Sequence, residues 1–166
     1  TASVSSGTFS NNQSVTLTSA TATSTIYYTT DGSTPTTGST LYSGAISITA
    51  STTLKAIATK SLYTNSTVMN ESYTFQTATP TPSTAGGTHA VDQSITFTSS
   101  TTGASIYYTL DGSTPSATST LYTGAILVSS TTTIKAIAIK SGYENSGVTT
   151  DTYVIASNIA TVTSSS

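Results

Sequence analysis

Short stretches of alternating apolar and polar residues run along the chain, separated by turn-forming residues. The segment Val15-Thr16-Leu17-Thr18 alternates as a half-buried strand does. Residues 26–30 are β-branched or aromatic, and residues 53–60 alternate again. Further short strands are expected at residues 41–42, 45–48 and 68–75. No stretch combines a helical period with helix caps, so the pattern predicts an all-β protein with almost no helix.

The same pattern occurs twice. Ile26-Tyr27-Tyr28-Thr29 returns as Ile106-Tyr107-Tyr108-Thr109, and Lys55-Ala56-Ile57-Ala58 returns 80 residues later without a gap. About half of the aligned positions are identical, which indicates duplication of a whole domain and not a short solenoid repeat. Six or seven short strands in each copy favour a β-sandwich. We therefore predict two tandem immunoglobulin-like antiparallel β-sandwich domains.

Domain boundaries follow from this period and from two prolines. Pro80 and Pro82 disfavour a central strand between the copies and favour an extended connector. We place the first sandwich at residues 1–79 and the second at residues 80–160. Residues 161–166 resemble the start of the chain, and they are predicted to begin a third repeat or to form a strand donated to a neighbouring molecule.

One turn sequence is shared by both copies. Asp can accept hydrogen bonds from nearby backbone, Gly tolerates a positive φ, and Pro fixes φ, so these residue types favour a tight turn after the tyrosine strand. The predicted turn-forming residues are Asp31, Gly32 and Pro35, with Asp111, Gly112 and Pro115 in the second copy.

The composition is rich in hydroxyl groups and poor in charge. The chain has 42 Thr and 31 Ser among 166 residues, a net charge of −2 and only 6% charged residues. With four basic side chains, it lacks the phosphate contacts that nucleic-acid binding needs. No apolar run is long enough to span a bilayer. These observations argue against nucleic acid as a partner and against a membrane span.

Candidate catalytic and metal-binding residues are sparse. The chain has no Cys, and its single His, His89, corresponds to Phe9 in the first copy. A glycosidase needs two carboxylates across one bond, and no insertion of the sequence forms a cleft for such a pair. We predict that the protein is not an enzyme and has neither a cofactor nor a metal centre. A weak calcium site at the single Asp of each turn is left open.

The repeated residues resemble a known bacterial module. Ile26 through Pro35, Leu41 through Ile46 and Thr52 through Ala58 are similar to the chitobiase/β-hexosaminidase C-terminal domain family. The resemblance covers nearly the whole chain, twice. It implies an immunoglobulin- or fibronectin-like sandwich found in tandem in large secreted proteins. Because such modules are accessory parts of varied enzymes and surface proteins, the resemblance implies a scaffold and a setting, not an activity.

Ten tyrosines raise the question of glycan binding. Strand alternation places one ring of each Tyr-Tyr pair in the core and the other outside, so Tyr27 and Tyr107 are the candidate glycan-stacking residues. The alternative is that the outer rings form ordinary cross-strand pairs with Thr.

Taken together, these features predict a non-catalytic extracellular structural or adhesive surface protein. The partner would be another copy of the chain, in a filament joined through chain ends or edge strands, or a cell-surface glycan. Ile159 and Val162 near the chain end are the candidate subunit-interface residues. The alternative function is a carbohydrate-binding accessory module of a secreted glycoside hydrolase.

Overall fold

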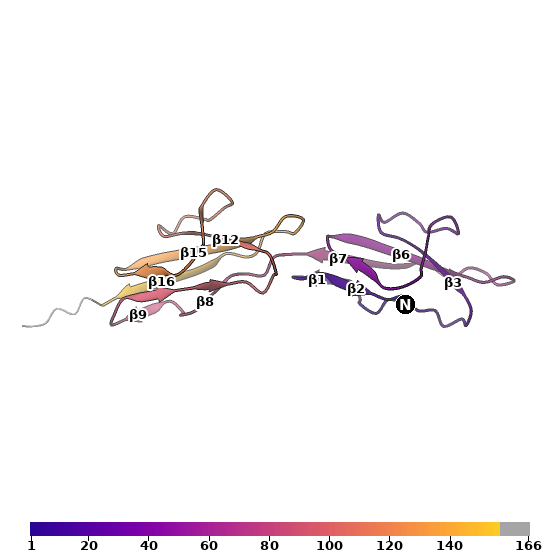
Figure 1. Ribbon diagram of the computed structural model, residues 1–166, viewed down its shortest axis with the longest axis horizontal. Coiled ribbons are helices and arrows are strands. Elements are labelled where there is room, and N and C mark those ends of the chain that lie inside the picture. The colour runs from indigo at the N-terminus through magenta and orange to yellow at the C-terminus, as the bar shows by residue number, and fades with distance from the viewer. Residues whose placement is uncertain (157–166) are drawn as a thin grey trace, which may run out of the picture. The chain divides into compact units, whose positions relative to one another are not determined.

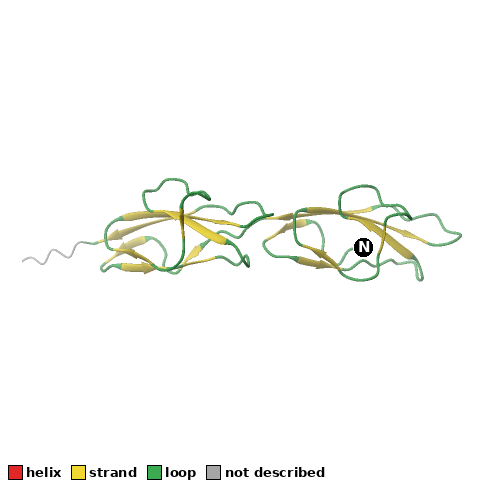
Figure 2. Ribbon diagram, turned by 45° about the horizontal axis from the view of Figure 1, so that its top comes forward, coloured by secondary structure: helices red, strands yellow, loops and turns green. Residues whose placement is uncertain are grey.

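The computed structural model describes residues 1–156 of the chain, and every regular element among them is a β-strand (Figure 2). The described chain divides into two compact units. The first comprises Thr1–Gln76 together with Ser141–Glu144, and the second comprises Thr77–Lys140 together with the described residues from Asn145 on. The second unit therefore begins at Thr77, ahead of the predicted start at Pro80. Ile159 and Val162 lie outside the described residues.

Two layers form the first unit (Figure 1). The larger sheet has the strand order β1 (Gly7–Phe9), β7 (Met69–Phe75), β6 (Thr52–Thr59), β3 (Thr25–Thr29) and β4 (Thr40–Leu41). The second layer pairs β2 (Gln13–Val15) with β5 (Ile46–Ile48), and an isolated bridge joins Ala2 to Leu17. This arrangement is the predicted sandwich.

The second unit repeats this topology. Its larger sheet has the order β13 (Thr120–Leu121), β12 (Ser105–Thr109), β15 (Thr132–Ile139), β16 (Thr149–Ile155) and β9 (Gly87–His89). The second layer contains the pair β10 (Gln93–Ile95) and β14 (Ile126–Val128), and the pair β8 (Thr81–Pro82) and β11 (Phe97–Thr98). The expectation of tandem immunoglobulin-like sandwiches is thus confirmed.

The core of each unit lies between its two layers, and the alternation of apolar residues explains which side chains enter it. Inward positions of β6 and β7 meet inward positions of β2 and β5. The buried set of the first unit is Val15, Leu17, Ile46, Ile48, Leu54, Ala56, Tyr73 and Phe75. The corresponding set of the second unit is Ile95, Phe97, Ile106, Ile126, Val128, Ile134, Ala136, Ala138 and Tyr153. Burial of these apolar surfaces is what stabilises such small sandwiches.

One tyrosine is fully buried in each core, and its hydroxyl has a partner. Tyr73 donates to the backbone oxygen of Val4 at 2.7 Å, and Tyr153 donates to that of Thr84 at 2.7 Å. A buried phenol needs such an acceptor, since an unpaired hydroxyl in the core is costly. These bonds also fix the first residues of each sandwich against its last strand.

Between the strands of the described chain the pairing is antiparallel except at one edge of each larger sheet, where β1 pairs with β7 and β9 with β16 in parallel. The chain enters in the smaller layer at Ala2 and then crosses to the larger one. Glu71 accepts hydrogen bonds from the amide and the hydroxyl of Ser6 at the crossing, at 2.6 and 2.5 Å. Because the first strand changes layers, it meets the last strand running in the same direction.

Candidate functional site

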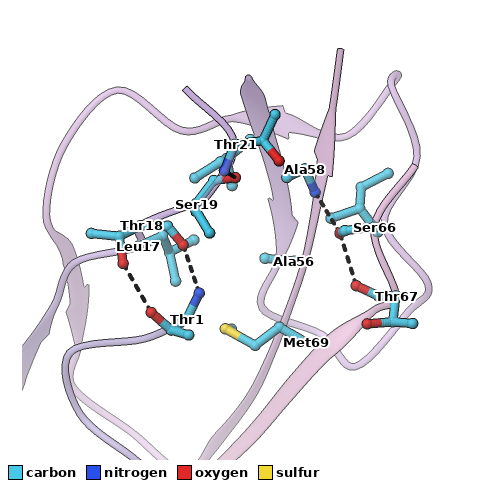
Figure 3. Close-up of a pocket in the computed structure, with 13 residues that line it drawn as sticks. Thr1, Leu17, Thr18, Ser19, Thr21, Ala56, Ala58, Ser66, Thr67 and Met69 are labelled. Atoms are coloured by element: carbon cyan, nitrogen blue, oxygen red, sulfur yellow. Dashed lines mark hydrogen bonds between the residues drawn. The ribbon is translucent and has the colours of Figure 1, made fainter. Parts of the chain in front are cut away.

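A pocket in the first unit has a volume of about 420 Å³. Figure 3 shows Thr18, Ser19 and Thr21 on one side of it and Ser66 and Thr67 on the other, with Ala56 and Met69 between them. We call this pocket the groove. Its lining residues are Thr1, Leu17, Thr18, Ser19, Ala20, Thr21, Ile26, Ala56, Ile57, Ala58, Ser66, Thr67 and Met69.

Hydrogen bonds hold both walls of the groove in place. The amino group of Thr1 donates to the backbone oxygen of Thr18 at 2.6 Å, and the hydroxyls of these two residues are 2.9 Å apart. On the opposite wall, the amide of Ala58 donates to Ser66 Oγ at 2.9 Å, and Ser66 Oγ donates to the oxygen of Thr67 at 2.8 Å. The walls are therefore held by backbone groups and short hydroxyl side chains and not by long flexible side chains.

The chemistry of the groove is that of hydroxyl, backbone and apolar groups. The lining residues contribute one ionisable group, the amino group of Thr1. They contribute neither a carboxylate nor an imidazole. General acid–base catalysis requires a titratable side chain placed at the reacting bond. The groove can donate and accept neutral hydrogen bonds and cover apolar atoms, and these are the properties of a surface that binds an extended chain.

The matching surface of the second unit is covered. Thr21 and Ser66 are exposed in the first unit, whereas their equivalents Thr101 and Ser146 are buried, with 2% and 7% of their surface accessible. Ile106 and Ala138 are likewise buried, and their equivalents in the first unit are half-buried. The cover is the segment of residues 77–80, in which Thr77 and Pro80 are themselves buried.

The predicted turn residues form a hydrogen-bonded loop after β3. Asp31 Oδ1 accepts the amide of Ser33 at 2.9 Å and its hydroxyl at 2.6 Å, and Gly32 has a φ of +79°. These hydrogen bonds, the hydroxyl first, lower the pKa of Asp31 below its usual value. Pro35 is buried behind the loop.

The second copy reproduces this loop with the same distances between Asp111 and Ser113, and with a φ of +77° at Gly112. The pKa of Asp111 is lowered by the same hydrogen bonds from Ser113, the hydroxyl again contributing most. Pro115 is buried as Pro35 is. In both copies the carboxylate is engaged by its own loop.

The candidate glycan-stacking rings lie on the outer face of the larger sheets. Tyr28 packs against the core and meets Tyr42 edge-on at 6.5 Å, so Tyr27 points to the opposite face. Tyr27 lies beside Leu41 and Ile57 in the strand register, and it is half-buried. Tyr107 has the matching position beside Leu121 and Ile137. Glycan stacking by these two rings stays a prediction.

The remaining chemical candidates are dispersed. His89 stacks on Tyr153 with ring centroids 5.8 Å apart, in the place where Phe9 contacts Tyr73 in the first unit. In the described part of the chain, no three His, Cys, Asp or Glu residues gather closely enough to hold a metal ion. Residues 1–156 also contain no helix of the length and apolarity needed to cross a membrane.

The groove is a feature that the sequence analysis missed. Its signal was present, since Ser19 and Thr21 return as Ser99 and Thr101 in the duplicate. Strand alternation does not register these positions, because they lie in a loop after the last residue of the strand pattern. Only the contact between that loop and the preceding connector shows what the two hydroxyls do.

Comparison with solved structures finds chains of low sequence identity that align over most of this chain. The fibronectin(III)-like modules of Clostridium thermocellum CbhA show 17% identity and a TM-score of 0.34, with 92% of this chain and 90% of that chain covered. A chimeric titin Z1Z2–Z1Z2 tandem carrying a GRGDS peptide from fibronectin shows 12% identity and a TM-score of 0.32, with 87% and 90% covered. No curated protein sequence matches the chain.

A family match covers most of both repeats. The sequence profile described as "Chitobiase/beta-hexosaminidase C-terminal domain" matches residues 4–70 and again residues 84–150. The two matched ranges are offset by the same 80 residues as the sequence repeat, and each spans most of the strands of one sandwich up to the start of its last strand. The chain therefore belongs to the chitobiase/beta-hexosaminidase C-terminal domain family, of which it carries two tandem copies.

Proposed function

We propose that this chain is a non-catalytic structural element of an extracellular surface protein, and that copies of it assemble end to end. The observation that carries the proposal is the groove. It is a preformed hydroxyl-lined and apolar surface in the first unit, and its duplicate in the second unit is covered by an extended chain segment. A surface of this kind fits a polypeptide better than it fits a small reacting substrate.

The surface composition supports the same function. Charge of one sign keeps dissolved monomers apart, and this chain has a net charge of only −2. Exposed apolar side chains add to the tendency to associate, for example Leu62 and Leu127, which are 101% and 70% accessible. A contact between different surfaces at the two ends of a molecule generates an open filament when it does not close on itself.

Glycan binding is the competing function. Membership of an accessory-module family supports it, and so does the outward position of Tyr27 and Tyr107. Both rings are half-buried beside apolar neighbours, so they offer less free face than a stacking platform uses. The open groove therefore favours self-association over stacking on sugar.

Two measurements on the whole chain separate these functions. Sedimentation velocity and negative-stain microscopy should show large linear assemblies that grow with protein concentration. Retention on insoluble chitin, cellulose and cell-wall glycan should stay at the level of a protein without glycan affinity. Strictly monomeric protein that is retained on glycan would replace the structural function with the accessory one.

A further inference from the structure

The segment that covers the second unit is held by both backbone groups of Ala78. The amide of Ala78 donates to Thr101 Oγ1 at 2.8 Å, and Ser99 Oγ donates to the backbone oxygen of Ala78 at 2.9 Å. Both atoms of the segment belong to the main chain. Any residue other than proline could therefore take the place of Ala78 without loss of these two hydrogen bonds.

The first unit keeps both hydroxyl residues and the hydrogen bond between them. Ser19 Oγ accepts the amide of Thr21 at 3.2 Å, as Ser99 Oγ accepts the amide of Thr101 at 3.3 Å. In the second unit, the hydroxyl of Ser99 can therefore donate its proton to the carbonyl of Ala78, and the hydroxyl oxygen of Thr101 can accept the amide of Ala78. The groove of the first unit is thus already shaped for one residue of extended backbone.

The opposite wall differs, and the difference selects the next residue of the bound segment. In the second unit Thr79 lies against Gly147, and a Cβ added at Gly147 would be 3.0 Å from Thr79 Oγ1. The hydroxyl of Thr149 donates to the backbone oxygen of Pro80. The first unit has Thr67 and Met69 at these positions. A thioether cannot make the hydrogen bond of Thr149, and it favours an apolar neighbour instead.

The 80-residue period identifies a segment of this chain with that character. Residues 157–160 stand where residues 77–80 stand in the preceding repeat, so Asn158 corresponds to Ala78 and Ile159 to Thr79. Neither is a proline, and the second is apolar. Ile159 would therefore meet Thr67, in place of the threonine that meets a glycine, and the apolar Ala160 would take the place of Pro80 beside Met69.

We propose that residues 157–160 of a second copy bind in the groove of the first unit. The backbone of Asn158 pairs with the hydroxyls of Ser19 and Thr21, Ile159 lies against Thr67, and Ala160 lies beside Met69. This inference rests on the proposed end-to-end assembly and names the two surfaces that meet in it. One copy's groove receives the next copy's tail, so the contact is head to tail and repeats without limit.

The first test removes the two hydroxyls from the groove. The double variant Ser19→Ala with Thr21→Val should weaken association of the whole chain on the order of tenfold or more, since two hydrogen bonds are lost. Circular dichroism should show the same fold. The matched control, Ser99→Ala with Thr101→Val, alters the covered surface and should leave the association constant unchanged. Equal association of both double variants would overturn the assignment of the groove.

The second test uses the absence of cysteine from the chain. A Thr21→Cys chain mixed with an Asn158→Cys chain should form a disulfide-linked heterodimer on mild oxidation, much faster than either chain pairs with itself. The positive control places Ala78→Cys and Thr101→Cys in one molecule, where an intrachain bond is expected. A Thr21→Cys chain that links to Asn158→Cys no faster than to Ser43→Cys would contradict the proposal.

A third measurement separates failure of this inference from failure of the proposed function. A synthetic peptide of residues 156–166 is titrated into the full chain at a concentration where the chain is monomeric, and amide shifts are followed by NMR. Shifts centred on Ser19, Thr21 and Met69 support the groove, even if the chain alone never polymerises and the proposed function fails. Assembly that persists without such shifts and without the cross-link keeps the function and rejects this contact.

Discussion

The two units carry the same loop with the same serine and threonine, and the surroundings of that loop differ. In the second unit residues 77–80 lie over it, and Thr101 is 2% accessible. In the first unit the surface is open, and Thr21 is exposed. The threonine hydroxyl is therefore a buried hydrogen-bond acceptor in the second unit, at Thr101, and it lines the groove in the first unit, at Thr21.

This contrast shows that the sequence repeat and the structural unit have different limits. The cover of the second sandwich comes from the connector that precedes it, so residues 77–80 belong to the structural unit although they stand before the repeated strands. A copy with an uncovered groove has hydrogen-bonding groups and apolar surface available to a segment from elsewhere. Predictions about stability should therefore differ between matched positions of the two units.

The largest expected difference concerns the isoleucine next to the cover. Ile106 is buried, so Ile106→Ala should lower the free energy of unfolding of the second unit by about 3 kcal/mol, through lost burial and the cavity left behind. Ile26 is half-buried, and Ile26→Ala should cost the first unit about 1 kcal/mol. Denaturant unfolding followed by hydrogen exchange and mass spectrometry reports on each unit separately. Equal losses at both positions would show that the cover adds no burial.

A smaller difference is expected for the threonine itself. Thr101→Val leaves the amide of Ala78 without an acceptor under the cover, which should cost about 1 to 2 kcal/mol in the second unit. Thr21→Val at low protein concentration should change the first unit by less than about 0.5 kcal/mol, because its hydroxyl is exposed. The same unit-resolved hydrogen exchange measures both. A large loss from Thr21→Val would mean that this hydroxyl is part of the first unit's own structure.

Much of the fold follows from local pattern. Val15 and Leu17 are buried and Thr16 is exposed, as strict alternation requires, and Tyr28 takes the inner position that the Tyr-Tyr pair offers. The period of 80 residues predicts two units because a duplicated pattern folds twice. These features depend on residues near one another in sequence or on exact repetition, and both can be read from a single chain.

The groove and the parallel edge could not be predicted from local pattern or from repetition. At the crossing of the first strand, Glu71 accepts two hydrogen bonds from Ser6, across 65 residues of sequence. The cover depends on Ser99 and Thr101 meeting a connector whose prolines indicate only an extended chain. Ser and Thr are so frequent in this sequence that the few hydroxyls with buried partners are not distinguishable from those facing water.

The buried tyrosines should make both units sensitive to alkali, the second more strongly. Burial, followed by the negative charge of Asp151, raises the pKa of Tyr153 to about 12, and burial also raises the pKa of Tyr73. A raised pKa stabilises the fold below the unfolded value near 10, and that contribution is lost as pH rises toward 12. Unfolding free energy should therefore fall above pH 10.

The matched variants Tyr153→Phe and Tyr73→Phe test this assignment. Each removes a hydroxyl that donates to a backbone oxygen, so each should cost about 1 kcal/mol near pH 7. Each should also flatten the alkaline loss of stability in its own unit, measured by denaturation in steps from pH 8 to pH 12. If the alkaline loss in the second unit is unchanged in Tyr153→Phe, another group causes it.

The smallest effect is expected at the two turn aspartates, where the units are alike and should respond alike. Hydrogen bonds from Ser33 and Ser113 lower the pKa of Asp31 and Asp111, so the folded state favours the carboxylate in both loops. A lowered pKa stabilises the fold above the unfolded value near 4, and the stabilisation disappears as pH falls through the folded pKa. Asp31→Asn and Asp111→Asn can keep the bond to the serine amide through the side-chain oxygen, and each should remove a slight acid dependence from its own unit. Unit-resolved hydrogen exchange between pH 2.5 and pH 5 measures this. An acid dependence that changes in only one unit would show that these two loops, unlike the grooves, differ in a way that their identical hydrogen bonds do not reveal.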